Sequence, residues 1–200
     1  MTASKLGDIS GKDTRTRLVE GMADLLWERG YVGTSPTAVL QRTGVGQGSL
    51  YHHFAGKQDL AVAGIRMNAD TLTRAAREAL DGPGTAYERL ERFLLRDRDV
   101  LRGCRIGRMT QDPDVFAAEA LREPVAEALA WVRTAIAEVI EEGQARGELA
   151  AGLAPDDLAA TILSTLQGGY VLARAELDEA RFTAAVRGLL GLLKALVVAP

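Results

Sequence analysis

Apolar side chains recur at intervals of three and four residues along almost the whole chain. In the first such segment, residues 13–29, the side chains of Leu18, Met22, Leu25 and Leu26 fall on one face of a helix. Alternation of apolar and polar residues, which is typical of a half-buried strand, is absent from the sequence. The pattern therefore predicts an all-α fold.

Glycine and proline residues predict where the helices begin and end. We expect helices over residues 13–29, 36–42, 46–54, 57–80, 85–102, 104–109, 114–143 (in one or two segments), 155–177 and 179–197. Pro36 and Pro155 suit the first turn of a helix, where a missing N–H is tolerated. Pro124 is expected to begin the longer helix within residues 114–143, because an interior proline would kink it.

Two short predicted helices flank Gly44, which would supply the positive φ of a tight turn. This arrangement is typical of a helix-turn-helix, whose second helix enters the major groove of DNA. Leu50 and Phe54 are four residues apart and would hold the inner face of that second helix against the first predicted helix. The outer face would then be free to contact DNA.

Net charge alone argues against a nucleic-acid partner, since the chain carries −3. The charge is unevenly distributed, however: residues 1–66 hold 8 Lys and Arg against 6 Asp and Glu, or +2, which leaves 16 against 21, or −5, for the remainder. A mildly basic front end on an acidic body suits a DNA reader with an appended regulatory domain. The excess is too small to decide the question alone.

An ordered set of motifs around this unit closely resembles the DNA-binding region of TetR-family repressors. The motifs are R-L-V-E at 17–20, E-R-G-Y at 28–31, T-S at 34–35, T-G-V at 43–45, G-S-L-Y-H-H-F at 48–54 and K-Q-D-L at 57–60. The resemblance implies a three-helix DNA-binding domain with a helix-turn-helix in residues 1–56 and a C-terminal helical ligand-binding and dimerisation domain in residues 57–200. It also implies a sequence-specific transcriptional regulator, a repressor that a small-molecule ligand releases from double-stranded operator DNA.

The residues expected to contact DNA lie at helix starts or on the outer face of the second short helix: Thr34, Ser35, Thr37, Gln47, Ser49, Tyr51, His52 and Lys57. Gln47 could read an adenine edge or bind a phosphate, and Lys57 would offer one phosphate both its charge and a helix N-terminus. Gly46 and Gln47 depart from the family pattern, in which a serine and often a lysine are usual. The departure removes a side-chain cap and one charge, so affinity is expected to rest more on Lys57 and on Arg42, Lys12 and Arg15.

The last two predicted helices carry an apolar stripe that the resemblance assigns to a homodimer interface. Its members are Ile162, Thr165, Leu166, Gly169, Leu172 or Ala173, Phe182, Val186, Leu189, Leu190 and Leu193. They could build a four-helix bundle between subunits, and an ordinary core within one chain is the alternative. A two-fold dimer would place two recognition helices about 34 Å apart, in successive major grooves.

A pocket for an apolar or aromatic inducer is expected among the middle helices. The candidate lining residues are Tyr87, Phe93, Met109, Phe116, Trp131, Gln167, Tyr170 and Arg174. Arg108 and Arg174 could pair with a ligand carboxylate, and solvated salt bridges are the alternative. The segment R-G-C-R-I-G at 102–107 resembles a Gly-Cys-x-x-Gly element of one family subgroup, which implies a tight helix start under the pocket.

Other classes of function fit the sequence less well. An enzyme with Cys104 or Ser49 as nucleophile lacks a recognisable triad, and His52 and His53 have no further ligands at metal spacing, so no cofactor or metal is expected. A lone cysteine forms no internal disulfide, and a small buried hydrophobe is favoured over a redox sensor for Cys104. No run is apolar enough to span a membrane and no cleavable signal is recognisable, which predicts a cytoplasmic location. A helical interaction module that has lost DNA binding stays open as an alternative.

Overall fold

The computed structural model describes residues 13–198 and confirms the all-α prediction. The helices are α1 (Thr14–Arg29), α2 (Pro36–Thr43), α3 (Gln47–His53), α4 (Lys57–Leu80), α5 (Ala86–Leu95), the 3-10 helix η1 (Gly107–Gln111), α6 (Pro113–Ala117), α7 (Glu119–Ala145), α8 (Pro155–Glu176) and α9 (Ala180–Lys194). Within residues 13–198, extended pairing is confined to one isolated bridge between Leu149 and Val197.

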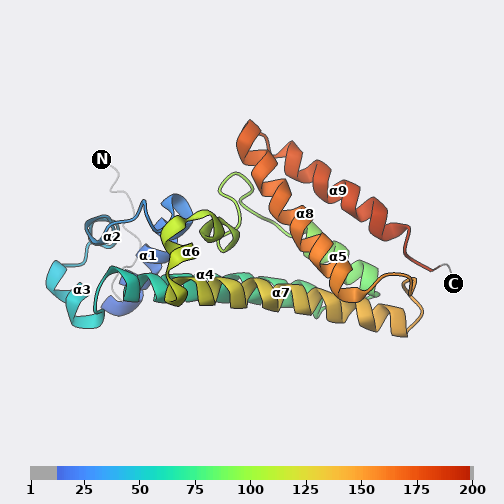
Figure 1. Ribbon diagram of the computed structural model, residues 1–200, viewed down its shortest axis with the longest axis horizontal. Coiled ribbons are helices and arrows are strands. Elements are labelled where there is room, and N and C mark those ends of the chain that lie inside the picture. Colours follow the sequence, from blue (N-terminus) through green and yellow to red (C-terminus); the bar gives the residue numbers. More distant parts are fainter. Residues whose placement is uncertain (1–12, 199–200) are drawn as a thin grey trace, which may run out of the picture.

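The molecule is elongated, with the three short N-terminal helices at one end (Figure 1). The long helices α4 and α7 pack along each other and connect this end to the other, where α8 and α9 form an antiparallel pair. One core cluster holds α1, α2, α3 and the first half of α4 together with residues 104–128, and a second holds α5, α8, α9, the second half of α7 and the other half of α4. Helices α4 and α7 therefore each belong to both cores and connect them.

The helix-turn-helix forms for the local reasons that its sequence indicates. Ser35 caps α2 through an acceptor bond from Ala38 N–H at 3.2 Å, and Pro36 occupies the first turn. Gly44 ends the helix at φ +65°, a left-handed conformation that favours glycine. Leu50 and Phe54 are buried against α1, as predicted, and so fix which face of α3 points outward.

Helix α5 is shorter than predicted, because it ends at Leu95 rather than near residue 102. The Arg98 guanidinium donates to the carbonyl oxygens of Phe93 and Leu94, which satisfies the last turn and lets the chain leave the helix. The segment predicted as a helix over 104–109 is instead a 3-10 helix that begins at Gly107. Pro124 does not begin a helix as predicted but lies inside α7, within its first two turns.

The apolar stripe assigned to a subunit interface lies mostly inside the chain's own core. Ile162, Leu166 and Ala173 of α8 are buried with Phe182 and Val186 of α9. The α8 and α9 helices pack so closely at Gly169 that a Cβ atom there would lie 3.0 Å from the Phe182 ring. The alternative reading of this stripe, a core within one chain, is therefore the one that the structure supports.

Candidate functional site

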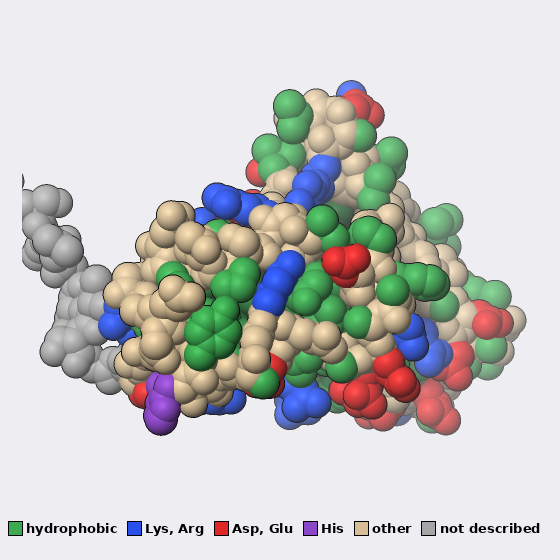
Figure 2. All heavy atoms as spheres, turned by 60° about the vertical axis from the view of Figure 1, so that its left-hand side comes forward, with side chains coloured by type: hydrophobic (Ala, Val, Ile, Leu, Met, Phe, Trp, Pro, Cys, Tyr) green, Lys and Arg blue, Asp and Glu red, His purple; other side chains and the backbone are tan. Residues whose placement is uncertain are grey.

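The outer face of α3 is exposed to solvent at the end of the molecule. Gln47, Gly48, Tyr51 and His52 are exposed, with 56% of Tyr51 accessible, and Ser49 is half-buried at the edge of this face. Figure 2, which brings this end forward, shows histidine at its lower edge and most of the visible acidic side chains toward the other end. Helix α3 itself contains no acidic residue, so it adds no negative charge that would repel a phosphate backbone.

The start of α2 lies beside α3 and presents Ser35 and Thr37 to solvent. Thr34 is a correction to the predicted set. It is only 1% exposed, and its hydroxyl donates to the Gly30 carbonyl oxygen at 2.7 Å. Its side chain therefore closes the α1–α2 loop and does not face a ligand.

The basic residues near this surface differ in whether their charge is already paired with an acidic side chain. Arg42 forms ion pairs with Asp24 and, at 2.6 Å, with Glu28, so its charge is already compensated. Lys57 Nζ lies 3.9 Å from the centre of the Tyr31 ring, a contact that orients the ammonium group without neutralising it. Arg15 lies over Phe54, and Lys12 is outside the described residues. Lys57 and Arg15 are thus better placed than Arg42 to attract phosphate.

Helix α3 begins without a side-chain cap, because its N-cap residue is Gly46. A side chain at Gly46 would meet nothing within 4 Å, and its φ of −73° suits any residue. We expect Gly46→Ser to stabilise the protein by about 0.5–1 kcal/mol through a new cap and a less flexible unfolded chain. Chemical denaturation measures the change. Gly44→Ser is the matched control and should destabilise, since Gly44 has a φ of +65°; equal effects of the two changes would contradict the argument.

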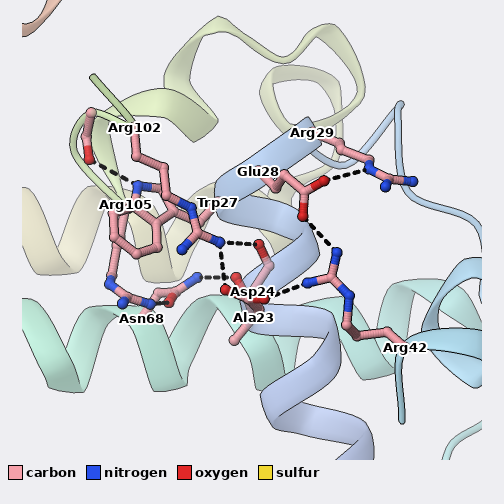
Figure 3. Close-up of polar contacts among 10 residues, drawn as sticks. Ala23, Asp24, Trp27, Glu28, Arg29, Arg42, Asn68, Arg102 and Arg105 are labelled. Carbon is pink, nitrogen blue, oxygen red and sulfur yellow. Dashed lines mark hydrogen bonds and ion pairs between the residues drawn. The ribbon is translucent and has the colours of Figure 1, made fainter. Parts of the chain in front are cut away.

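A cluster of polar and aromatic contacts ties α1 to the segment that follows α5 (Figure 3). The guanidinium groups of Arg102 and Arg105 lie 3.8 Å and 3.7 Å from the centre of the Trp27 ring, and Trp27 Nε1 donates to the Gly103 carbonyl oxygen at 2.8 Å. Asp24 of α1 pairs with Arg102 on one side and with Arg42 of α2 on the other. The segment after α5 is therefore linked through Asp24 to the helix-turn-helix.

Asp112 makes a second link, between the start of α6 and the loop that joins α1 to α2. Its Oδ2 atom accepts from the N–H groups of Tyr31 and Val32 at 2.7 and 2.9 Å, while Oδ1 accepts from Asp114 and Val115 at 3.2 and 3.4 Å. The residue is 8% exposed. One carboxylate thus caps α6 and holds the α1–α2 loop at the same time.

A cavity of about 680 Å³ lies directly beside these links. Its wall is formed by the end of α1, the segment 103–113, α7 and α8: Arg29, Gly30, Gly103, Cys104, Gly107, Arg108, Thr110, Gln111, Asp112, Pro113, Leu129, Gln167, Tyr170, Val171, Arg174 and Ala175. This volume is within the range of small-molecule sites in proteins. The cavity wall therefore includes residues on both sides of the joint between the helix-turn-helix end and the rest of the chain.

The structure brings together Gln167, Tyr170 and Arg174 from the predicted ligand set and places the other members elsewhere. Phe93 and Met109 are buried in the two cores, and Phe116 is 72% exposed on α6. Tyr87 hydrogen-bonds Glu91, and Trp131 lies under Arg77. Phe93 and Met109 are thus core residues, and five of the eight candidates do not line this cavity.

The sequence placed the G-C-x-x-G element under the pocket and Arg108 beside a ligand carboxylate, and both lie in the cavity wall; the contributions of Thr110, Gln111, Asp112 and Pro113 were not foreseen. In the G-C-x-x-G element, Gly103 has a φ of +84°, and Cys104 Sγ accepts from Gly107 N–H at 3.2 Å. A Cβ atom at Gly107 would lie 2.1 Å from Gln167 Oε1, so this segment approaches the Gln167 side chain of α8 closely. The two glycines shape the cavity wall around Cys104.

Burial shifts the ionisation of several groups around the cavity. It raises the pKa of Tyr170 to about 12 and lowers the pKa of Arg98, its neighbour, to about 10. Burial, together with the like charge of Arg174, also lowers the pKa of Arg108. Positive charge is therefore held in this region at a cost in free energy.

Residues 13–198 contain no helix that is both long and apolar enough to cross a membrane. The same residues show no cluster of three or more His, Cys, Asp or Glu side chains placed to hold a metal ion.

Comparison with known proteins gives consistent matches over both parts of the chain. Residues 18–63 match the family of bacterial regulatory proteins called tetR, and residues 86–189 match the tetracyclin repressor-like C-terminal domain. The transcriptional regulator AcuR of Cereibacter sphaeroides is 31% identical, over 80% of this chain and 76% of its own. The HTH-type transcriptional repressor DhaR of a Mycobacterium species is 29% identical, over 81% of this chain and 83% of its own.

Solved structures agree with these sequence matches. A cysteine mutant of the TetR-family regulator CifR, in complex with 26 bp of double-stranded operator DNA, superposes with a TM-score of 0.75. It is 26% identical and covers 92% of this chain and 98% of its own. The similarity includes both the helix-turn-helix end and the helices around the cavity.

Proposed function

Because this chain belongs to the TetR family of DNA-binding transcriptional regulators, we propose that it represses transcription as a homodimer and leaves its operator when a small molecule occupies the cavity. The observation that carries the proposal is the Asp112 carboxylate, which lines the cavity and accepts from two N–H groups of the α1–α2 loop. A ligand in the cavity would therefore contact the residues that hold the α1–α2 loop. This loop orients the helix-turn-helix, which we call the reading head. The repressor name of DhaR and the operator complex of CifR support this function.

The proposed DNA contacts are the exposed residues of α3 and the starts of α2 and α4. They are Ser35, Thr37, Gln47, Ser49, Tyr51, His52 and Lys57, without Thr34. We assign Gln47 to a base edge and Lys57 to a phosphate, because only the first lies on the outer face of the recognition helix.

Release of the operator requires a ligand that binds one conformation of the dimer more tightly than the other. In the favoured conformation, the two reading heads do not fit successive major grooves. A ligand shifts this equilibrium only by its difference in affinity for the two conformations. A ligand in the cavity would directly contact residues next to the reading head. These are Arg29 and Gly30 at the end of α1, and Gly103 beside Trp27. Movement of the wall would thus reorient α1 and the helix-turn-helix that packs on it.

The homodimer, the domain boundary and the location complete the proposal. The outward face of α8 and α9 exposes Leu172, Leu177 and Leu192, which a second subunit would cover.

We keep residues 1–56 as the DNA-binding domain and 57–200 as the ligand and dimerisation domain, with α4 shared by both cores. We place the protein in the cytoplasm, where its operator would be, and assign it no enzymatic activity; no histidine lies beside Cys104 in the cavity wall.

Electrophoretic mobility shift tests the assigned contacts, with the full-length protein and the DNA upstream of its own gene at several salt concentrations. Lys57→Ala should weaken binding to all sequences and lower the salt slope by about 1, because one phosphate contact is lost. Gln47→Ala should change the preference at one base position at a cost of about 1–3 kcal/mol. Equal losses on every operator variant for both changes would contradict the roles, and a dimer that never shifts this DNA would favour the non-binding alternative.

A further inference from the structure

The charged residues that line the cavity are mostly arginines, and the balancing acids are used elsewhere. Asp112 is the acidic residue of the wall, and four backbone N–H groups already occupy its two oxygens. Arg29, at the rim, is paired with Glu28 at 3.0 Å. Neither acid is therefore available to Arg108 or Arg174.

Arg108 and Arg174 have no carboxylate partner within residues 13–198. Arg174 donates to the Arg102 carbonyl oxygen at 3.1 Å, which leaves its charge uncompensated, and the Arg108 guanidinium makes neither a hydrogen bond nor an ion pair with the described residues. The two guanidinium groups are close enough that Arg174 lowers the pKa of Arg108. Half-buried like charges without a partner are destabilising unless another group compensates them.

More positive charge lies immediately behind this wall. Arg96 and Arg98 are half-buried near Tyr170 and Cys104, and burial lowers the pKa of both. Arg98 donates to backbone carbonyl oxygens, while Arg96 Nε is buried without a hydrogen-bond partner in the described part of the chain. Four arginines thus surround one side of the cavity.

We propose that the cavity binds a small organic anion whose oxyanion headgroup lies between Arg108 and Arg174. This inference rests on the proposed function and narrows its ligand: the sequence predicts an apolar or aromatic inducer and leaves open whether Arg108 and Arg174 pair with a ligand carboxylate or form solvated salt bridges. Guanidinium groups bind carboxylate and phosphate oxygens through paired, charge-assisted hydrogen bonds. The Gln167 amide and the Thr110 hydroxyl offer further polar contacts, and Leu129 and Val171 offer an apolar surface for the body of the ligand.

Matched pairs of ligands test the proposal on the full-length protein without DNA. Isothermal titration calorimetry would compare octanoate with octanamide, benzoate with benzamide, and add phenyl phosphate as a second oxyanion. We expect octanoate or benzoate to bind at least tenfold more tightly than its amide, or phenyl phosphate to bind at least tenfold more tightly than benzamide. The class of anion that binds more tightly, carboxylate or phosphate, identifies the headgroup. Amides that bind as well as the anions, or failure of every anion to bind, would overturn the proposal.

Variants of the two arginines show whether they hold the headgroup. Arg108→Gln and Arg174→Gln should each weaken the anion at least fivefold and leave the amide within twofold. Arg133→Gln is the matched control, because Arg133 pairs with Asp156 on the exposed side of α7, away from the cavity, and it should change neither affinity. Arginine variants that behave like this control would overturn the proposal.

The thermal midpoint of the ligand-free protein provides a readout that needs no ligand. Since Arg108 has no partner to lose, Arg108→Gln should raise Tm, by about 2 °C. A fall in Tm would show that the residue is already compensated and would contradict the proposal.

Mobility shift then separates failure of this inference from failure of the proposed function. Release of the operator by neutral amides, with no binding of anions, would overturn the anion site and leave the ligand-released repressor standing. Binding of anions by calorimetry without release of the operator would support the site and contradict ligand-controlled repression.

Discussion

Gly48→Glu is expected to abolish operator binding while the protein folds normally. Gly48 lies on the exposed face of α3 between Gln47 and Ser49, and a Cβ atom there would meet nothing within 4 Å. The free protein therefore accommodates a larger side chain at little cost. In the major groove, the same side chain would bring a negative charge and added bulk against the bases and phosphates.

We expect operator affinity to fall at least 100-fold, or about 2.7 kcal/mol, with a Tm close to that of the unchanged protein. Mobility shift and circular dichroism measure the two quantities. Gly152→Glu is the control, because Gly152 is exposed and open in the loop before α8 and receives the same charge far from α3. Retention of operator affinity in Gly48→Glu would show that α3 does not enter the groove.

The helix-turn-helix could be predicted from the sequence because the interactions that form it are local. Leu50 and Phe54 are one helical turn apart, Ser35 caps the helix that follows it, and Gly44 adopts the positive φ that its position suggested. The limits of α4, residues 57 and 80, were also predicted from adjacent breaks. Each of these features depends on a few neighbouring residues.

The cavity could be predicted only in part because burial depends on packing between distant segments. Phe93 and Tyr170 are both aromatic residues on apolar helices, yet the first is in the core and the second lines the cavity. The availability of Arg42 depends on Asp24 and Glu28, which lie 18 and 14 residues earlier on another helix. Helical periodicity likewise continued past Leu95, where Arg98 ends α5 by binding its carbonyl oxygens.

Charged side chains also link the segment after α5 to the helix-turn-helix. Asp24 connects Arg102 to Arg42, so a displacement of the segment after α5 reaches α2 through one carboxylate. Exposed ion pairs of this kind contribute little to stability and exchange readily with water. Such a link suits a joint with two arrangements of similar free energy, whereas the buried carboxylate of Asp112 sets how far the joint can open.

Asp112→Asn should be the most destabilising of the single changes considered. The aspartate accepts four N–H bonds, two at each oxygen, whereas an asparagine amide must turn an NH₂ group toward one of these donor pairs. Two buried N–H groups would then face another donor. With about 1.5–3 kcal/mol for each bond to a charged acceptor, we expect a loss of about 3 kcal/mol in the free energy of unfolding.

Hydrogen exchange would locate the effect of Asp112→Asn as well as measure it. If the amide turns toward the α1–α2 loop, the Tyr31 and Val32 N–H groups should lose protection about 100-fold, while those of α8 change only with global stability. Operator affinity should fall about tenfold, since the loop sets the orientation of α2 and α3 relative to α4. Asp114→Asn is the control, because that neighbouring side chain is exposed and makes no such bonds to the loop. Unchanged protection of Tyr31 and Val32, together with unchanged operator affinity, would mean that Asp112 does not join the cavity to the reading head.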